Sequence, residues 1–333
     1  MSWGWTPPSS SPVAPAPDVI SVRTGNGLQV AHDLLTSGGI IQLGAGTYYA
    51  DPASPTTALS WTNSGIAIIG AGRDSTIIAS PIDGKVGNGK LESLIIRPPG
   101  GAYGLKLFRD ENVFPGGGGV PRWVLDRVFI GAADATGRDA GLGPAKGLWL
   151  DGAIVGLFSQ CLFAFCSESG VYADTTQPPN WSTNVHEFVG CTMNLNSRYG
   201  VELVGSAMEG FRFEGGTMNS NVLGEVNANN MNHLELLGID FETGVAVASV
   251  LNIGAVHPLT VEGCNFVTSG STKAVRAFIF STCATVRVVG NKFQGFTNAE
   301  YGIFDENCTN CIEYHNENSD GDDRVIVNRS GRS

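Results

Sequence analysis

The residues best suited to chemistry in this chain are three carboxylates that recur at a regular spacing. Asp151 and Asp174 each end a short stretch that begins with glycine and then alternates apolar and other residues, and Glu202 lies in a third such stretch. Two carboxylates held about 5 Å apart suit the acid and the nucleophile of a retaining glycosidase. With water and a third carboxylate, the same group suits Ca2+. We therefore take Asp151, Asp174 and Glu202 as the candidate catalytic residues.

Aromatic side chains accompany these carboxylates. Trp149 precedes Asp151 by two residues, and Tyr172 precedes Asp174 by two. Because aromatic rings pack on the apolar face of a sugar, Trp149 and Tyr172 are candidate saccharide-binding residues, and Trp181, in a nearby proline-containing insert, is a third. The alternative is structural: outward aspartates cap turns, and outward rings stack along a repetitive fold. The sequence alone favours this structural role over binding, and binding over catalysis.

Two short phrases that alternate along the chain must position these residues. The first starts with a small residue and then alternates, as in residues 147–151, 170–174 and 200–204. The second reads apolar-x-x-(Cys, Gly, Ile or Asn)-x-(Phe or Met), and its six copies begin at residues 158, 188, 213, 236, 261 and 288. A regular repeat of this length, built from period-2 strands and glycine turns, indicates a β-solenoid.

The repeat assigns side chains to columns, because neighbouring coils of a solenoid lie about 4.8 Å apart. The bulky residues that close the second phrase should form one internal stack, namely Phe163, Met193, Met218, Phe241, Phe266 and Phe293. In the first phrase, the second and fourth residues after the glycine should face outward. The candidate carboxylates and aromatic residues then lie together on one exposed face, over three consecutive coils.

The seven cysteines are an odd number and do not resemble a disulfide framework. Cys161, Cys191 and Cys264 occupy one slot of the repeat, whereas Cys283 and Cys308 are one repeat apart. We expect all five to be buried free thiols, which are common core groups. The C-x-x-C sequence near the C-terminus lacks the partner pair of a zinc site, so we expect no bound metal there.

Composition and charge exclude several classes of protein. Glycine is frequent at 45 of 333 residues, but there is no Gly-X-Y period, and 42% hydrophobic residues are too many for a disordered chain. The net charge of -11 argues against a nucleic-acid partner. No stretch approaches membrane-spanning length, and no apolar run of signal-peptide length precedes Arg23. We expect neither nucleic acid nor membrane as a partner, and no cofactor other than the Ca2+ considered above.

The chain divides into three regions. Residues 1–17 are a proline- and serine-rich tail that cannot bury a core, yet they contain Trp3 and Trp5. We take these two tryptophans as anchoring residues that insert into a partner, with folding of the tail back on its own body as an equal alternative. Residues 18–317 form the solenoid and residues 318–333 a polar C-terminal tail. Within that tail, residues 325–327 are either a last strand or a segment that docks on a neighbouring subunit.

Residues 27–35 place Leu28, Ala31, Leu34 and Leu35 at helical spacing. An amphipathic helix here would cover the apolar lumen and the unpaired strand groups of the first coil. The stretch Leu43-Gly-Ala-Gly-Thr-Tyr that follows, with a glycine-rich segment at residues 65–78, resembles the N-terminal signature of the pectate-lyase-like superfamily. The resemblance covers about residues 18–315. It implies an all-β fold, a single-stranded right-handed parallel β-helix of about nine or ten coils with a short N-terminal capping helix.

The catalytic motifs of that superfamily are absent. The sequence contains no Gly-His-Gly, no Asn-Thr-Asp, no Trp-Ile-Asp-His and no Arg-x-Pro-x-x-Arg, and its five histidines are scattered. The resemblance therefore carries no activity over to this chain. Whether the protein is an enzyme stays open, and a non-catalytic role is favoured.

A β-helix with a short N-terminal tail also resembles phage tailspikes and the tailspike-like spikes that decorate capsids. This resemblance implies a homotrimer on the surface of a virion, attached to other virion proteins through its N-terminal tail and contacting host-surface polysaccharide. One alternative is a polysaccharide lyase or glycoside hydrolase with its site between Trp149 and Glu202. A second alternative is a purely structural capsid decoration protein.

Overall fold

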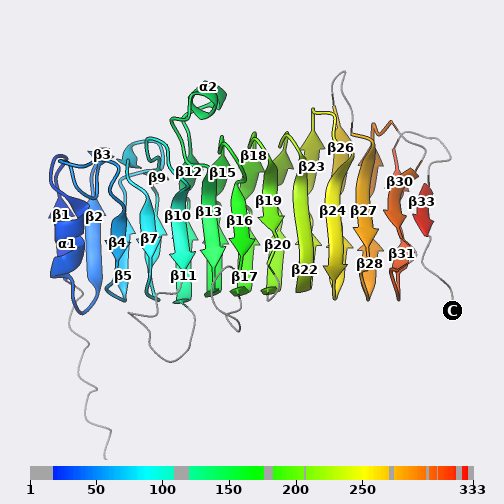
Figure 1. Ribbon diagram of the computed structural model, residues 1–333, viewed down its shortest axis with the longest axis horizontal. Helices are drawn as coiled ribbons and strands as arrows, with labels where there is room; N and C mark the ends of the chain where they lie inside the picture. The colour runs from blue at the N-terminus through cyan, green and yellow to red at the C-terminus, as the bar shows by residue number, and fades with distance from the viewer. Residues whose placement is uncertain are drawn as a thin grey trace, which may run out of the picture.

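The computed structural model describes residues 18–108, 120–175, 183–205, 208–269, 274–297, 300–305, 307–319 and 325–328. Strands of successive coils lie side by side along one long axis, from β1 at the N-terminal end to β33 at the C-terminal end (Figure 1). Every pairing between these strands is parallel, and each strand pairs with its counterparts in the preceding and following coils. The parallel β-solenoid that the repeat predicted is therefore confirmed.

The first face carries the first phrase of the repeat. Its strands, in order along the axis, are β4 (Leu59–Trp61), β7 (Ile82–Gly84), β10 (Tyr103–Phe108), β13 (Lys146–Asp151), β16 (Val171–Asp174), β19 (Tyr199–Leu203), the start of β22 (Gly224–Leu237), β24 (Ser249–Val256), β27 (Arg276–Ser281), β30 (Glu300–Phe304) and β33 (Val325–Asn328). Because β33 pairs with β30, residues 325–327 form a last strand, which was one of their two predicted alternatives.

The second face carries the start of the second phrase. Its strands are β1 (Val19–Val22), β2 (Gly39–Leu43), β5 (Ile66–Ile69), β8 (Lys90–Glu92), β11 (Val120–Asp126), β14 (Ala153–Ser159), β17 (Thr183–Val189), β20 (Met208–Glu214), the end of β22, β25 (Leu259–Glu262), β28 (Val286–Val289) and β31 (Ile312–Tyr314). Strand β22 crosses from the first face to the second, so these two faces form one 22-stranded sheet.

The third face is an 11-stranded sheet that carries the end of the second phrase. Its strands are β3 (Gly46–Tyr48), β6 (Thr76–Ile78), β9 (Ile95–Ile96), β12 (Phe129–Gly131), β15 (Leu162–Ala164), β18 (Thr192–Asn194), β21 (Thr217–Asn219), β23 (Asp240–Thr243), β26 (Asn265–Thr268), β29 (Lys292–Gln294) and β32 (Glu317–Asn318). The solenoid thus has about eleven coils rather than nine or ten, because the early coils lack the full phrases from which coils were counted.

The core lies inside the three faces and follows the predicted columns. Strand register links each bulky residue that closes the second phrase to the next, from Phe163 to Phe293, and all six are buried. The rings of Phe241 and Phe266 stack with centroids 4.7 Å apart. The five cysteines that were predicted to be core thiols are buried and free, whereas Cys311 is half-buried. Both internal columns are confirmed.

The corner between the second and third faces explains the glycine of the second phrase. In five coils this corner residue is a glycine with φ between 58° and 65°: Gly190, Gly215, Gly238, Gly263 and Gly290. Its N–H donates to a carbonyl of the next coil, as from Gly190 to Glu214 at 2.8 Å. Glycine is favoured because other residues reach this left-handed conformation only at a cost in energy.

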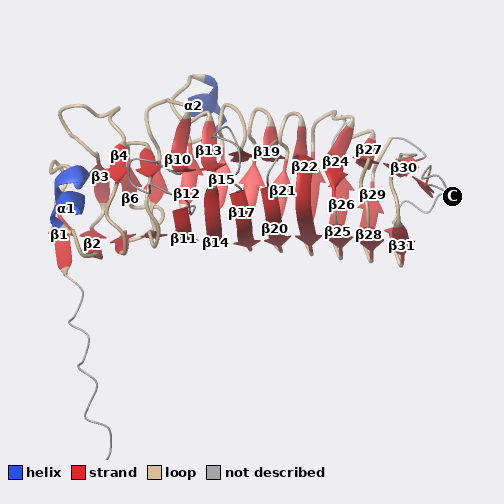
Figure 2. Ribbon diagram, turned by 60° about the horizontal axis from the view of Figure 1, so that its bottom comes forward, coloured by secondary structure: helices blue, strands red, loops and turns tan. Residues whose placement is uncertain are grey.

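Helix α1 (Leu28–Leu34) covers the N-terminal end of the solenoid, which confirms the predicted cap (Figure 2). The predicted apolar stripe needs one correction, because Leu34 is 68% exposed. His32 is buried in its place, and its ring packs edge-on against Trp61 with centroids 5.8 Å apart. The Asn63 N–H donates to His32 Nε2 at 3.3 Å, so the buried imidazole has a polar partner.

The insert before β13 contains helix α2 (Ala135–Asp139), which projects from the body and was not predicted (Figure 1). Asp134 caps it by accepting a hydrogen bond from the Gly137 N–H at 2.8 Å. Neither α1 nor α2, the helices of the described chain, is long and apolar enough to cross a membrane.

Candidate binding face around Trp149 and Tyr172

Strands β13, β16 and β19 of the first face bring the predicted site residues together. Trp149 is the register partner of Tyr172, and Asp151 is the partner of Asp174. In the next coil, Tyr172 is the partner of Glu202. The repeat therefore predicted the neighbours in this set correctly, one coil after another.

The burial of the three carboxylates differs from the prediction. Asp151, Asp174 and Glu202 are 0%, 6% and 3% exposed, whereas Trp149 and Tyr172 are half-buried. The expectation of an exposed row of carboxylates was wrong. The reason is that long side chains of neighbouring residues cover the carboxylates and bind them.

Lys106, one coil before Trp149 on β10, covers Asp151. Its Nζ lies 3.2 Å from Asp151 Oδ2. The same Nζ lies 3.9 Å from the centroid of the Trp149 ring, within the range of a cation–π contact. Lys106 therefore joins the buried carboxylate of Asp151 to the indole of Trp149.

Asp174 fixes the opposite edge of the same indole. Trp149 Nε1–H donates to Asp174 Oδ1 at 2.8 Å. Burial raises the pKa of Asp174, the hydrogen bond from Trp149 lowers it, and the negative charge of Asp151 raises it, with a net shift upward. Burial, helped by Asp174 and Glu202, also raises the pKa of Tyr172 to about 12, so its phenol is protonated at neutral pH.

Glu202 uses both carboxylate oxygens within the protein. Ser169 Oγ–H donates to Oε2 at 2.6 Å, and Arg198 Nη2–H donates to Oε1 at 2.7 Å. Ser169 precedes β16 and Arg198 precedes β19, so Glu202 ties together the turns that lead into two strands of the face. This geometry suits a positioning role.

Three residues that the sequence analysis did not identify complete the face: Tyr103, Lys106 and Lys146. The Tyr103 ring meets Trp149 edge-on at 5.9 Å, and Trp149 meets Tyr172 in the same way at 5.9 Å. Lys146 Nζ lies 5.0 Å from the Trp149 ring and 4.6 Å from the Tyr172 ring. Residues 104–108 (Gly-Leu-Lys-Leu-Phe) carry the first phrase and place Lys106 in the same column as Trp149, so the sequence held a signal for Lys106 that the comparison of the later coils missed.

The face is thus a row of three half-buried rings, held in place by buried carboxylates and flanked by two lysines. Among the residues that the structure describes, no group of three or more His, Cys, Asp or Glu side chains is arranged to hold a metal ion. Trp181, the third aromatic candidate, lies outside the described residues, as do Trp3 and Trp5. The arrangement can present apolar ring surface and hydrogen-bond donors to a ligand.

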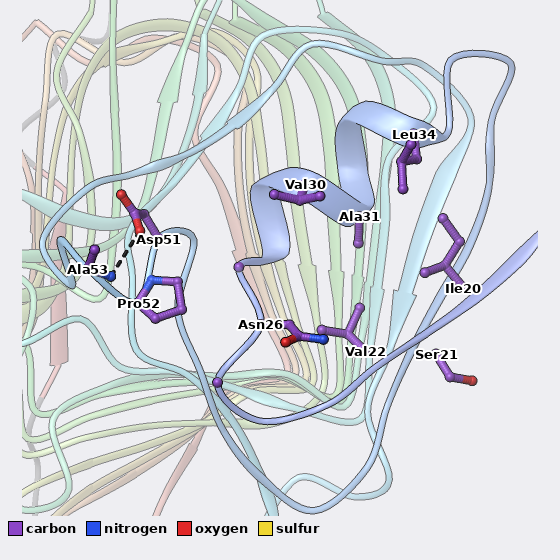
Figure 3. Close-up of a pocket in the computed structure, with 12 residues that line it drawn as sticks. Ile20, Ser21, Val22, Asn26, Val30, Ala31, Leu34, Asp51, Pro52 and Ala53 are labelled. Atoms are coloured by element: carbon purple, nitrogen blue, oxygen red, sulfur yellow. Dashed lines mark hydrogen bonds between the residues drawn. The ribbon is translucent and has the colours of Figure 1, made fainter.

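A concavity of about 540 Å3 lies at the N-terminal end between β1 and α1 (Figure 3). Val30 and Leu34 of α1 line it and are 66% and 68% exposed. Pro52 and Ala53 form part of its opposite wall. This apolar surface lies beside β1, the strand that residues 1–17 precede in the chain.

No protein-family model matches this chain, and no curated protein matches it. Solved structures match at low identity. Tailspike protein 2 from Escherichia coli O157:H7 bacteriophage CAB120 has a TM-score of 0.59 and 15% identity, over 85% of this chain and 40% of that one. Tailspike protein gp49 from Acinetobacter baumannii bacteriophage Fri1, a capsular polysaccharide depolymerase, has a TM-score of 0.58 and 12% identity, over 93% and 62%. PfbA, a surface adhesin of Streptococcus pneumoniae, has a TM-score of 0.53 and 8% identity, over 87% and 86%.

These similarities establish the fold, a right-handed parallel β-helix that matches phage tailspikes. The chain spans 40% of the length of one tailspike and 62% of the other. The activities of those proteins are therefore considered for this chain only as proposals.

Proposed function

We propose that this protein is a virion-attached β-helical spike that contacts host-surface polysaccharide through the face formed by Tyr103, Trp149 and Tyr172. The observation that carries the proposal is the row of three neighbouring rings, whose central indole is held from two sides by Asp174 and Lys106. Rings fixed in this way offer apolar surface to a sugar at little cost in side-chain entropy. The tailspike-like fold supports the placement on a virion.

Binding without cleavage is the favoured form of this proposal. Asp151, Asp174 and Glu202 are buried and bonded to Lys106, Trp149, Ser169 and Arg198, so they position the face. One observation favours a depolymerase as the second candidate: the raised pKa of Asp174 beside Asp151 is typical of a general acid. In that case, Asp174 would protonate the leaving oxygen, and a ligand would first have to displace the covering side chains.

The binding proposal is tested with Trp149→Ala and purified polysaccharide from the host surface. We expect the affinity to fall by about 1 to 3 kcal/mol, because a central aromatic anchor is lost. Tyr314→Ala is the matched control, since Tyr314 is an exposed ring on the second face. An unchanged polysaccharide affinity of Trp149→Ala would rule out this face as the binding site. If the wild-type protein does not bind the polysaccharide, the alternative of a purely structural capsid decoration protein is favoured.

We also propose that the spike is a homotrimer whose subunits meet through the second face. Val155, Leu157 and Val185 of neighbouring strands β14 and β17 are exposed there, and such a cluster of apolar side chains is typical of an interface. Light scattering should give three times the mass of the chain. Leu157→Glu with Val185→Glu should yield monomers that keep the β-sheet circular dichroism signal, and a wild-type monomer would contradict this part of the proposal.

Attachment to other virion proteins is proposed to use residues 1–17, with Trp3 and Trp5 as anchors. The apolar concavity beside α1 supports this placement, because it offers a partner further apolar surface next to the start of β1. Deletion of residues 2–17 should leave the solenoid folded and abolish incorporation into the particle. Normal incorporation of the truncated protein would reject the anchoring role.

A further inference from the structure

The type of residue at the corner between the second and third faces changes along the solenoid. In three consecutive coils near the N-terminal end, the left-handed corner residue is Ser93, Arg127 or Gln160, with φ of 55°, 54° and 50°. In each of the next five coils it is a glycine. The backbone bond is the same in both regions, as from Arg127 N–H to the Ser159 carbonyl at 2.9 Å. Backbone geometry therefore does not explain why three coils carry side chains.

Lack of space does not explain the later glycines either. A Cβ added at Gly215, Gly238 or Gly263 would meet nothing within 4 Å. Left-handed backbone appears at other corners of the molecule, so its presence alone is no sign of function. The informative observation is the contrast within one column: three consecutive coils keep a costly side chain where the next five use glycine, before His315 ends the column. Retained strain of this kind is common at ligand sites.

The three side chains line one groove of about 480 Å3, within the size range of small-ligand sites. Arg73 and Asp74, from the turn between β5 and β6, form the rest of its polar wall. The groove lies at the junction of the second and third faces, whereas Trp149 lies on the first face. It is therefore separate from the candidate binding face and does not depend on the function proposed for that face.

The two guanidinium groups of the groove indicate the class of ligand, and Asp74 is the one carboxylate among the described residues that line it. The Arg127 guanidinium is oriented by Glu92 Oε1 at 2.7 Å and by Asp126 Oδ2 at 3.1 Å. Arg73 is exposed, and within the described part of the chain it forms no ion pair. Guanidinium groups bind the paired oxygens of carboxylates and phosphates. The amide of Gln160 and the hydroxyl of Ser93 are suited to the hydroxyl groups of a sugar.

We propose that this corner groove binds an acidic saccharide unit, with the sugar oxyanion on Arg73 and Arg127 and the sugar hydroxyl groups on Gln160 and Ser93. The groove is then a second saccharide site, specific for charge and distinct from the aromatic face. The oxyanion is a carboxylate or a phosphate, which the probes below distinguish.

The test is a ligand-observed NMR titration of the full chain at low salt with three probes. They are a tetrasaccharide of alternating glucuronate and N-acetylglucosamine, its carboxyl-reduced neutral form, and glucose 6-phosphate. We expect the first or the third probe to bind, which identifies the carboxylate or the phosphate, and the neutral form to bind at least tenfold more weakly. Arg73→Gln should weaken binding about tenfold, the scale of one charge-assisted hydrogen bond.

The Gln160→Gly variant distinguishes a role of this side chain in ligand binding from a role in stability. It should weaken binding several-fold while leaving the unfolding midpoint unchanged or higher, because glycine relieves the left-handed backbone. Ser220→Gly is the matched control, since Ser220 has φ of 54° at another corner, outside the groove, and should bind like the wild type. The proposal is overturned if neither acidic probe binds, if the neutral form binds equally well, or if Gln160→Gly binds normally or lowers the unfolding midpoint.

Discussion

Asp174 illustrates how one residue can be predicted correctly in place and wrongly in exposure. Its position beside Asp151 followed from the repeat, because strand register places equivalent residues of successive coils side by side. Its burial did not follow, since Lys106 and the half-buried indole of Trp149 cover this pair. The first phrase at residues 104–108 puts Lys106 in the same outward column as Trp149, a signal that the sequence analysis missed.

Replacement of Asp174 separates positioning from catalysis. Asp174→Asn keeps an acceptor for Trp149 Nε1–H, so we expect sugar binding close to that of the wild type. Asp174→Ala leaves the indole N–H without this acceptor, and it should cost about 1 to 3 kcal/mol of stability and weaken binding. Chemical denaturation and polysaccharide titration measure the two effects. Loss of a measurable hydrolysis in Asp174→Asn, with binding retained, would instead identify Asp174 as a catalytic acid.

Glu225 gives the fold a dependence on pH. It is fully buried at the start of β22, and burial raises its pKa to about 8, although hydrogen bonds from Asn221 oppose the shift. Because the folded pKa lies above the unfolded value of 4.5, Glu225 is protonated in the folded protein at neutral pH. The contribution of Glu225 to the free energy of unfolding is fully present below pH 4.5. It is lost as the pH rises toward 8, by about 1.4 kcal/mol per pH unit.

The expected result is a free energy of unfolding that falls between pH 5 and pH 8 in the wild type and falls less in Glu225→Gln. Urea denaturation across this range measures it. Glu209→Gln replaces an exposed glutamate on β20 and is the control, with the wild-type slope. Identical pH dependence of Glu225→Gln and the wild type would show that the buried carboxyl does not titrate in this range.

At the scale of elements, the internal stack is the main source of cohesion between coils. Phe241 packs between its register partners Met218 and Phe266 and is about 1% exposed. Phe241→Ala should reduce the free energy of unfolding by about 3 to 5 kcal/mol, because it removes buried ring surface and leaves a cavity. Urea denaturation checks this value. A loss below 1 kcal/mol would mean that the neighbouring coils collapse into the space.

The predictability of the elements follows the regularity of the sequence. Between β13 and β29, nearly every coil repeats the alternation of inward-facing and outward-facing residues and the glycine at the corner. Both internal columns were predicted in this region. Helix α2 and most strands of the early coils were not predicted, because inserts interrupt the repeat before residue 147. In α1, helical spacing places position 32 on the buried stripe with Leu28 and Leu35 and position 34 off it, but His32 was passed over because histidine is not an apolar residue.

At the scale of the whole molecule, about eleven coils stack along one axis, and each coil contacts mainly its neighbours (Figure 1). Such a molecule can place separate sites on different coils and faces. Helix α1 and the apolar concavity lie at the N-terminal end, whereas the corner groove and the aromatic face share the coils of β10 and β13 and lie on different sides of them. This order suits a spike that is attached at one end and exposes its sides to polysaccharide.

Hydrogen-exchange mass spectrometry with and without the host polysaccharide measures whether the first face around Trp149 contacts that polysaccharide. We expect slower exchange in peptides from β10, β13 and β16 of the wild type, and loss of that protection in Trp149→Ala. Protection confined to other strands, or the same protection in Trp149→Ala, would contradict this expectation.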